Sequence, residues 1–368
     1  MSHVLPQYGG GSIADVVESL CDGLRVPGAW DILSLGGAPR AVVLLIDGLG
    51  DLQLQDHREL APFLSEHRVR SVTSVTPSTT PVALTSLGTG VPPGRHGIVG
   101  ASFLVPQTGD LLWPLAWRDR PPVEEIQPES TWWQRAERAG VPVAIVGPRA
   151  YQGGGLTRAA LRGGSYVGAD GPGERVAAAA AAAGDGERAL VYSYWEHLDR
   201  AAHVHGVDSP HYRAELVAAD RFAEHLARQL PTGTRLVITA DHGLLDCPDT
   251  IDLEELTALW SGVSRVAGEP RLRHVYTRPA SRAETVDRWR DVLGPAATVV
   301  DRGQAVSDGW FGDVTDDAHE RLGDVIVVAE GRHRLALPGQ DAGVSSLIGQ
   351  HGAMSPEEMT VPLVVVDV

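Results

Sequence analysis

The sequence predicts an α/β protein built on a mostly parallel sheet with helices on both faces. Short apolar runs rich in β-branched residues alternate along the chain with segments of helical periodicity. Strands that are covered on both faces appear as such continuous apolar runs, and their alternation with helices is typical of parallel sheets. We therefore expect three layers, α/β/α, around a central sheet.

The expected central strands are apolar runs of five or six residues, and they cover residues 41–46, 141–146, 189–194 and 236–240. Residues 70–74 and 361–366 are expected to add two more strands. In sheets of this kind, ligands bind beyond the carboxyl ends of the strands. Polar residues that directly follow a strand are therefore the first candidates for a functional site.

The clearest helix is expected over residues 210–230, where apolar side chains such as Leu216 recur on one face. Ser209 followed by Pro210 supplies its start signal. Weaker helical patterns cover residues 132–139 and 176–183. These helices fall between the expected strands, as the layered arrangement requires.

The pattern changes over residues 248–347, where we expect a small α+β insertion. Its expected strands cover residues 273–277, 297–300 and 324–329. Its one expected helix covers residues 283–293. Residues 1–247 and 348–368 would then form one large core, which is within reach of a chain of 368 residues with 43% hydrophobic content.

The composition limits the classes of partner and compartment. The net charge is −16, the pI is near 5.3, and the basic residues are scattered arginines without any lysine, so a nucleic-acid partner is not expected. No apolar run is long enough to cross a bilayer and no export signal is recognisable, so we expect a cytoplasmic protein. Cys21 and Cys247 are too far apart in sequence to suggest a disulfide framework.

Acidic and histidine side chains directly follow two of the expected strands. Asp47 follows residues 41–46, and Asp241 with His242 follows residues 236–240. Asp47 alone, with a glycine after it, would be interpreted as a turn. Because the carboxyl ends of parallel strands meet at one edge of a sheet, however, we expect the three side chains to lie together.

Further possible ligands follow the strand at residues 189–194 and precede the last strand. Asp199 and His203 are four residues apart, which brings a hard oxygen and a borderline nitrogen to one side of a helical turn. His351 lies in a turn before residues 361–366. Such a pair on an exposed helix, or a lone histidine in a loop, is common without any function. These residues therefore indicate a site only in combination with Asp47, Asp241 and His242.

Thr80 lies in the segment P-S-T-T-P, after the expected strand at residues 70–74. Pro81 suits the first helical position, which makes Thr80 the expected N-cap. An N-cap threonine needs no catalytic role. The amino end of a helix also favours anions, which would suit both an oxyanion nucleophile and a bound phosphate.

Taken in order, these motifs resemble the nucleotide pyrophosphatase/phosphodiesterase branch of the alkaline phosphatase superfamily. The resemblance runs from about Ala41 to Val366 without most of the insertion, and it implies an alkaline phosphatase-like fold. It further implies a hydrolase of phosphate esters with two divalent metal ions, usually zinc, with manganese or iron as alternatives. The implied reaction passes through a phosphothreonine intermediate.

The resemblance also assigns roles to residues. An ungapped match of Pro77 to Gly90 places the nucleophile at Thr80, with Thr79 as the alternative if the match of Pro81 takes precedence. One metal ion would be bound by Asp199, His203 and His351, and the other by Asp47, Asp241, His242 and the oxygen of Thr80.

The substrate is less well defined than the reaction. Relatives that cleave diesters place an asparagine where this chain has Ala101, so a backbone amide or another residue, with Arg158 as a candidate, would have to contact the phosphoryl group. We expect a small phosphate ester or nucleotide as substrate. A phosphomonoesterase or a phosphonoacetate-type hydrolase is an alternative on the same scaffold, and a non-catalytic phosphate- or nucleotide-binding module is an alternative of another class.

Overall fold

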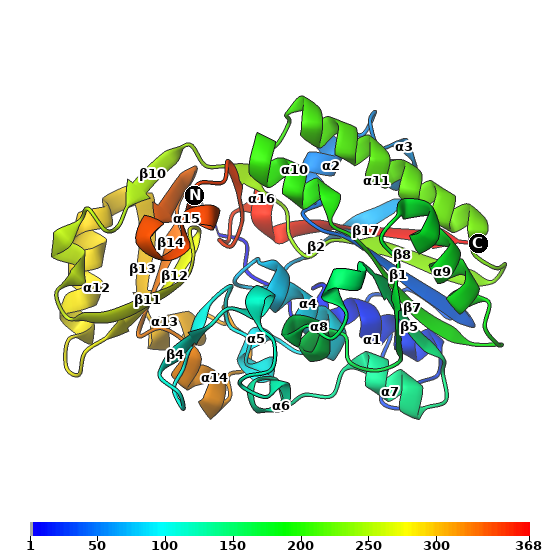
Figure 1. The fold of residues 1–368 in the computed structure, drawn as a ribbon, viewed down its shortest axis with the longest axis horizontal. Helices are drawn as coiled ribbons and strands as arrows, with labels where there is room; N and C mark the ends of the chain where they lie inside the picture. Colours follow the sequence, from blue (N-terminus) through cyan, green and yellow to red (C-terminus); the bar gives the residue numbers. More distant parts are fainter. Residues whose placement is uncertain (1–2) are drawn as a thin grey trace.

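The fold, seen in a computed structural model that describes residues 3–368, centres on a seven-stranded sheet in the order β2-β17-β8-β1-β7-β5-β6 (Figure 1). The first two residues of the predicted core fall outside the described chain. β17 runs antiparallel to its neighbours β2 and β8, and the remaining pairs are parallel. The strands are β1 (Arg40–Ile46), β2 (Arg68–Thr73), β5 (Val143–Gly147), β6 (Ser165–Gly168), β7 (Ala189–Trp195), β8 (Thr234–Thr239) and β17 (Thr360–Asp367).

The middle of this sheet is buried on both faces, as the continuous apolar runs predict. Every residue of β7, and every residue of β1 except Arg40, is buried. Leu45 of β1 is paired with Thr239 of β8, and Ile46 is paired with Trp195 of β7. The three strands therefore end together, and the residues that follow them share one edge of the sheet.

Helices cover both faces and confirm the three-layer prediction (Figure 1). One group packs around α11, and the other packs around α4. The first includes α2 (Asp51–Asp56), α3 (Pro62–Glu66), α9 (Pro172–Ala183), α10 (His197–His205) and α11 (Pro210–Gln229). The second includes α1 (Ala14–Gly23), α4 (Thr80–Thr89), α5 (Pro93–His96), α6 (Val123–Ile126), α7 (Trp132–Arg138) and α8 (Gly155–Ala160).

Two features of these helices follow from their sequence. The hydroxyl of Ser209 accepts a hydrogen bond from the Tyr212 amide, so α11 begins where its start signal predicts. α9 begins at Pro172, four residues before the predicted 176–183, because proline is well tolerated at the first helical position.

A second, four-stranded antiparallel sheet lies at one end of the molecule, in the order β11-β12-β14-β13. Its strands are β11 (Val263–Glu269), β12 (Leu272–Thr277), β13 (Ala297–Asp301) and β14 (Val325–Ala329), and α12 (Arg282–Leu293) packs against it. β11 was not predicted, because Ser264 and Arg265 interrupt its apolar pattern. One face forms a separate apolar cluster with Trp289, while Leu272 and Val328 belong to the main core. The boundary at residues 248–347 stays a prediction.

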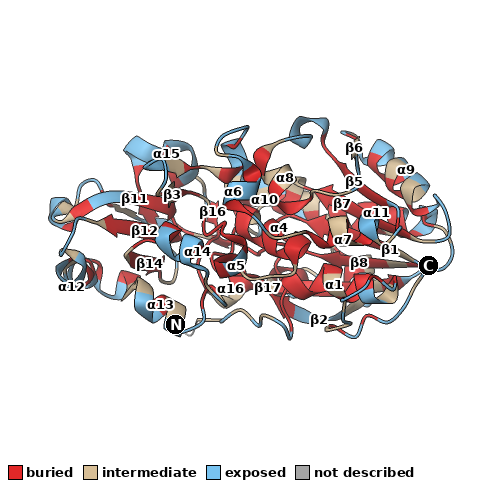
Figure 2. Ribbon diagram, turned by 90° about the horizontal axis from the view of Figure 1, so that it is seen from below, coloured by how far each residue is buried: buried red, intermediate tan, exposed pale blue. Residues whose placement is uncertain are grey.

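Short elements complete the chain, and buried residues fill both sheets (Figure 2). They are β3 (Phe103–Val105), β4 (Asp110–Leu112), β9 (Leu245–Asp246), β10 (Asp249–Asp252), β15 (His333–Ala336), β16 (Gly349–Gln350), α13 (Arg302–Ser307), α14 (Asp316–Arg321), α15 (Pro338–Ser345), α16 (Pro356–Met359), and the 3₁₀ turns η1 (Pro114–Ala116), η2 (Arg149–Tyr151), η3 (Thr257–Trp260) and η4 (Gly294–Ala296). Cys21 and Cys247 are buried free thiols. Over residues 3–368, no helix combines the length and the apolarity needed to cross a membrane.

A buried ion pair links the second sheet to the main one. Arg271, between β11 and β12, places Nη2 2.8 Å from Oε2 of Glu358 on α16, and both side chains are fully buried. A second bond of 3.0 Å joins Nε to Oε1, so the contact is bidentate. Loss of one partner would leave a buried charge without compensation.

We expect Glu358→Gln to lower the free energy of unfolding by about 3 kcal/mol, because it strands the Arg271 guanidinium in the core. The control is Glu224→Gln, which removes the partner of Arg228 from an exposed pair on α11 and should cost less than about 1 kcal/mol. Urea unfolding of both variants measures the difference. Equal losses would contradict the role given to the buried pair.

Candidate active site

The residues predicted after β1 and β8 do converge at the edge of the sheet. Asp47, Asp241 and His242 are all buried. Nε2 of His242 lies 3.4 Å from Oδ2 of Asp241 and 3.7 Å from Oδ1 of Asp47. Gly48 adopts a φ of +74°, which a side chain would strain, and its amide donates to Oδ1 of Asp241 at 3.1 Å. The Asp-Gly turn thus joins the two strand ends.

The other predicted ligands come from α10 and from the loop after β16. Oδ1 of Asp199 lies 3.3 Å from Nε2 of His203, and the ring of His351 is 5.1 Å from that of His203. The ring of His351 also stacks on that of His242, with 3.7 Å between centroids. The predicted ligands therefore form one continuous cluster.

Two sets of ligand atoms in this cluster are close enough to share an ion. Asp47, Asp241 and His242 form one set and Asp199, His242 and His351 the other, with the atoms of each set within 4.8 Å of one another. The first set matches the predicted grouping. In the second set, His242 stands where the resemblance implied His203.

Backbone carbonyls orient the histidines. Nδ1 of His203 is 2.7 Å from the carbonyl of Gly349, and Nδ1 of His351 is 3.0 Å from that of Ser78. A carbonyl accepts only, so each Nδ1 carries a proton and each Nε2 is the nitrogen directed at the cluster. Burial, and then His242 and His203, hold the pKa of His351 well below its usual range, so its ring stays neutral. This is the form that binds a metal ion.

Each of the three carboxylates of the cluster has one oxygen without a hydrogen bond. Oδ1 of Asp47, Oδ1 of Asp199 and Oδ2 of Asp241 are buried and accept no hydrogen bond. Burial, and after it the charges of Asp241 and Asp199, raise the pKa of Asp47 well above its usual value. Unpartnered buried carboxylates are costly unless a cation compensates them. The donor set therefore fits divalent metal ions, with mixed oxygen and nitrogen ligands of the kind zinc accepts.

Thr80 faces this cluster, with Oγ1 3.2 Å from Nε2 of His242. The predicted N-cap at Thr80 is wrong by one residue. Thr79 is the N-cap, with φ −140° and ψ 144°, and Thr80 already belongs to α4, which leaves Pro81 in the second helical position. The hydroxyl of Thr79 instead bonds to Glu269, whose pKa burial raises. Thr80 is thus the threonine turned toward the ligands.

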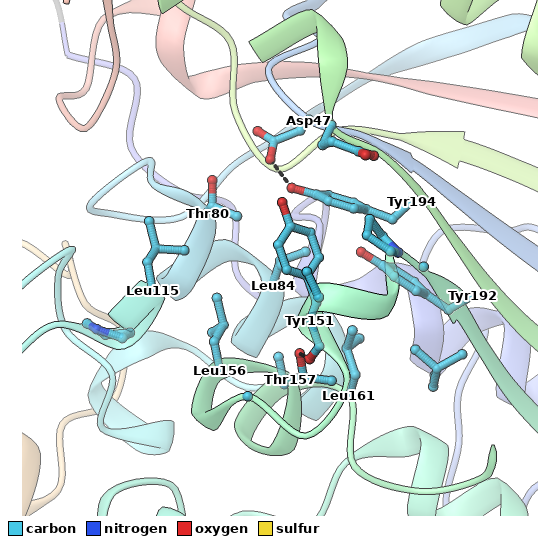
Figure 3. Close-up of a pocket in the computed structure, with 18 of the residues that line it drawn as sticks. Asp47, Thr80, Leu84, Leu115, Tyr151, Leu156, Thr157, Leu161, Tyr192 and Tyr194 are labelled. Atoms are coloured by element: carbon cyan, nitrogen blue, oxygen red, sulfur yellow. Dashed lines mark hydrogen bonds between the residues drawn. The ribbon is translucent and has the colours of Figure 1, made fainter. Parts of the chain in front are cut away.

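A cavity of about 540 Å³ opens beside Thr80 at the carboxyl ends of β1, β5 and β7 (Figure 3). The Tyr194 hydroxyl donates to Oδ2 of Asp47 and so connects the cavity wall to the ligand cluster. The tyrosines of the wall are Tyr151, Tyr166, Tyr192 and Tyr194, and the leucines are Leu84, Leu115, Leu156 and Leu161.

The proposed phosphoryl contacts do not lie in this wall. Arg158, on α8, donates from Nη2 to the carbonyl of Arg118 and lies 3.7 Å from Asp119. Among the described residues that line the cavity, neither Arg158 nor Ala101 is present. The structure gives no contact through which Arg158 would reach a phosphoryl group beside Thr80.

Sequence inspection missed several residues near the cluster. Tyr192 and Tyr194 are two residues apart on β7, so the alternation of a strand could have indicated that they share a face. Glu269 lies at the end of β11, with Oε2 3.6 Å from Nδ1 of His351. No local signal could have indicated this, because Glu269 belongs to the segment expected to form a separate insertion.

Comparison with known proteins agrees with this geometry. The family model for type I phosphodiesterase/nucleotide pyrophosphatase matches residues 41–354. Among curated proteins, none matches the chain in sequence. Solved structures share the fold.

Murine ectonucleotide pyrophosphatase/phosphodiesterase 5 superposes with a TM-score of 0.70 at 18% identity, over 88% of this chain and 87% of that one. An inactive form of that protein in complex with AMP superposes with a TM-score of 0.68 at 20% identity. The match covers 88% of this chain and 87% of that one. Phosphonoacetate hydrolase from Sinorhizobium meliloti 1021, in complex with phosphonoformate, superposes with a TM-score of 0.70 at 20% identity. The match covers 89% of this chain and 90% of that one.

Replacing Asp47 by asparagine tests whether the cluster needs a cation. In metal-free protein, the folded Asp47 carboxyl keeps its proton to a higher pH than the unfolded one, so stability falls as the pH rises above the ordinary value of 3.8. Asp47→Asn removes this loss of stability, because asparagine does not ionise. We expect metal-free Asp47→Asn to exceed metal-free wild type at pH 7 by about 1 to 2 kcal/mol in urea unfolding with a chelator present.

Added zinc should reverse the order, because it stabilises the folded wild type by binding. Asp110→Asn, which changes an exposed carboxylate on β4, serves as the control and should behave like wild type in both conditions. If metal-free Asp47→Asn were less stable than wild type, the carboxylates would not be repelling one another.

Proposed function

Since this chain belongs to the type I phosphodiesterase/nucleotide pyrophosphatase family, we propose that it hydrolyses phosphate esters with Thr80 as nucleophile and two divalent metal ions. The observation that carries the proposal is the position of Thr80. Its Oγ1 lies 3.2 Å from Nε2 of His242, inside the ligand cluster, and it also lines the cavity. A phosphoester hydrolase needs this combination of nucleophile, ligands and substrate space.

Asp47, Asp241, His242 and Thr80 Oγ1 would hold one ion, and Asp199, His203 and His351 the other. Zinc is proposed first, with manganese and iron as alternatives. When bound, the ions supply Lewis-acid stabilisation of phosphoryl oxygens and lower the pKa of the Thr80 hydroxyl. The carboxylates of Asp47, Asp199 and Asp241 balance three of the four positive charges, which leaves roughly one for an anionic substrate.

The chain's own residues orient the reaction. Thr80 is the first residue of α4, so its oxygen lies at the positive end of the helix dipole. Attack of Oγ1 on phosphorus would form an O–P bond while the bond to the leaving oxygen breaks on the opposite side, and the alcohol departs with a proton. Water then cleaves the Thr80 ester and releases phosphate or a phosphate monoester. Tyr194 holds Asp47 in place throughout.

The cavity favours an ester with an organic leaving group. Four tyrosines and four leucines are among its lining residues, and the cationic groups that line it are Arg200 and, when protonated, His197, both from α10. A carboxylated substrate such as phosphonoacetate would need a cation for its second charge, and Arg200 is the permanently charged group of the wall that could supply it. Aromatic or nucleoside esters of phosphate suit the aromatic wall better. A non-catalytic binding module would not require a threonine hydroxyl among the ligands.

Thr80→Ala should abolish turnover. We expect kcat/KM to fall by about 10³-fold or more for p-nitrophenyl phosphate, bis-p-nitrophenyl phosphate and a thymidine nucleotide ester, in the presence of zinc or manganese. Thr79→Ala is the matched control, because its hydroxyl is bonded to Glu269 and Thr79 is not among the described residues that line the cavity. It should keep most of the activity.

The same assays separate the alternatives. A large loss in Thr79→Ala with an active Thr80→Ala would move the nucleophile by one residue. If metal-loaded wild type hydrolysed none of the substrates, the binding module would replace the enzyme.

A further inference from the structure

The phosphoryl group that Thr80 attacks needs a hydrogen-bond donor that the expected positions do not supply. Ala101 has no polar side chain, and the guanidinium of Arg158 is bonded to the Arg118 carbonyl outside the cavity wall. A non-bridging oxygen that gains charge in the transition state is stabilised by a donor fixed in advance. Such a donor must be free of other bonds and must point at the space beside Thr80.

The tyrosines of the cavity differ in whether their hydroxyls are already used. The Tyr166 hydroxyl donates to the carbonyl of Pro148 at 2.7 Å, and that of Tyr194 donates to Asp47. Within residues 3–368, the hydroxyls of Tyr151 and Tyr192 form no hydrogen bond. Among the tyrosines of the wall, these two therefore have hydroxyls that are free to donate.

Tyr151 is the one directed at the reacting centre. Figure 3 shows its hydroxyl pointing toward Asp47 and the Tyr194 hydroxyl, on the side of the cavity where Thr80 lies. Tyr192 precedes Tyr194 on β7 and is therefore farther from the carboxyl end of the strand. The rings of Tyr151 and Tyr194 meet edge to face, with 6.2 Å between centroids.

The backbone of Tyr151 is held firmly, although 46% of the residue is exposed. Tyr151 ends the 3₁₀ turn η2, and its amide donates to the carbonyl of Pro148 at 3.1 Å. Its own carbonyl accepts from the Thr157 hydroxyl at 2.7 Å and from the Gly154 amide at 3.2 Å. Burial, and then Glu196 and Asp47, raise the pKa of Tyr151, so the phenol keeps its proton. The hydroxyl thus keeps its proton, on a backbone that is held in place by three hydrogen bonds.

We propose, on the basis of the proposed function, that the Tyr151 hydroxyl donates a hydrogen bond to a non-bridging phosphoryl oxygen of the bound ester. The contact would occupy the role for which Ala101 offers no side chain. Because the bond goes to the phosphoryl group and not to the leaving group, it should serve every substrate and also bind free inorganic phosphate.

Tyr151→Phe removes the hydroxyl and keeps the ring. With metal-loaded protein, we expect kcat/KM for bis-p-nitrophenyl phosphate and p-nitrophenyl phosphate to fall by on the order of 10- to 100-fold, as for loss of a bond to a charged group. The inhibition constant of inorganic phosphate should rise by a similar factor. Tyr212→Phe is the matched control, since Tyr212 lies on α11 outside the cavity wall and its buried hydroxyl forms no hydrogen bond with any described residue, and both quantities should stay within about twofold.

The outcomes distinguish the inference from the proposed function. Activity in wild type and Tyr212→Phe supports the proposed function whatever Tyr151→Phe does, whereas an inactive wild type overturns both. Unchanged phosphate inhibition in Tyr151→Phe overturns the inference, even with slower turnover, because the hydroxyl would then contact the leaving group. Metal content is measured alongside. A loss of metal in Tyr151→Phe would also overturn the inference, since the fall in activity and in phosphate binding would then come through the metal ligands.

Discussion

The mutual repulsion of buried carboxylates at the ends of β1 and β8 is the constraint on which the site depends. The parallel register brings Asp47 and Asp241 to one edge, and α10 adds Asp199 beside them. Each keeps an oxygen without a hydrogen bond. A fold that buries such groups together must compensate their charge, and the histidines beside them complete a donor set that fits metal ions.

The same edge determines where chemistry can occur. Thr80 enters it from the amino end of α4, with its hydroxyl beside His242. The aromatic cavity opens next to it, and the Tyr194 hydroxyl bonds directly to a proposed ligand, Asp47. In the proposed reaction, binding of the ions, attack by Thr80 and selection of the leaving group would be coupled through a few contacts between neighbouring strands.

Much of this could be predicted from the sequence, because the decisive signals are local. Apolar runs identified the strands of the main sheet, and the polar residues directly after them are the ones that converge. The sequence alone identified Asp47, Asp241 and His242 in this way. The assignment of their roles in catalysis stays a prediction, because the structure shows proximity and chemistry without turnover.

What could not be predicted depends on long-range packing. The contact between Glu269 and His351 joins two segments with no shared pattern. Arg158 is directed to Arg118 by a loop whose course the sequence does not reveal. The N-cap is Thr79 and not the predicted Thr80, because the choice between two adjacent threonines is decided by backbone angles and not by composition.

A crystal structure of the zinc-loaded protein, with anomalous scattering measured at the zinc edge, tests the central claim most directly. The account predicts two peaks within the cluster, one contacting Asp47, Asp241 and His242 and the other contacting Asp199, His203 and His351. Zinc bound only outside this cluster, or a carboxylate cluster left without any ion at saturating zinc, would contradict it.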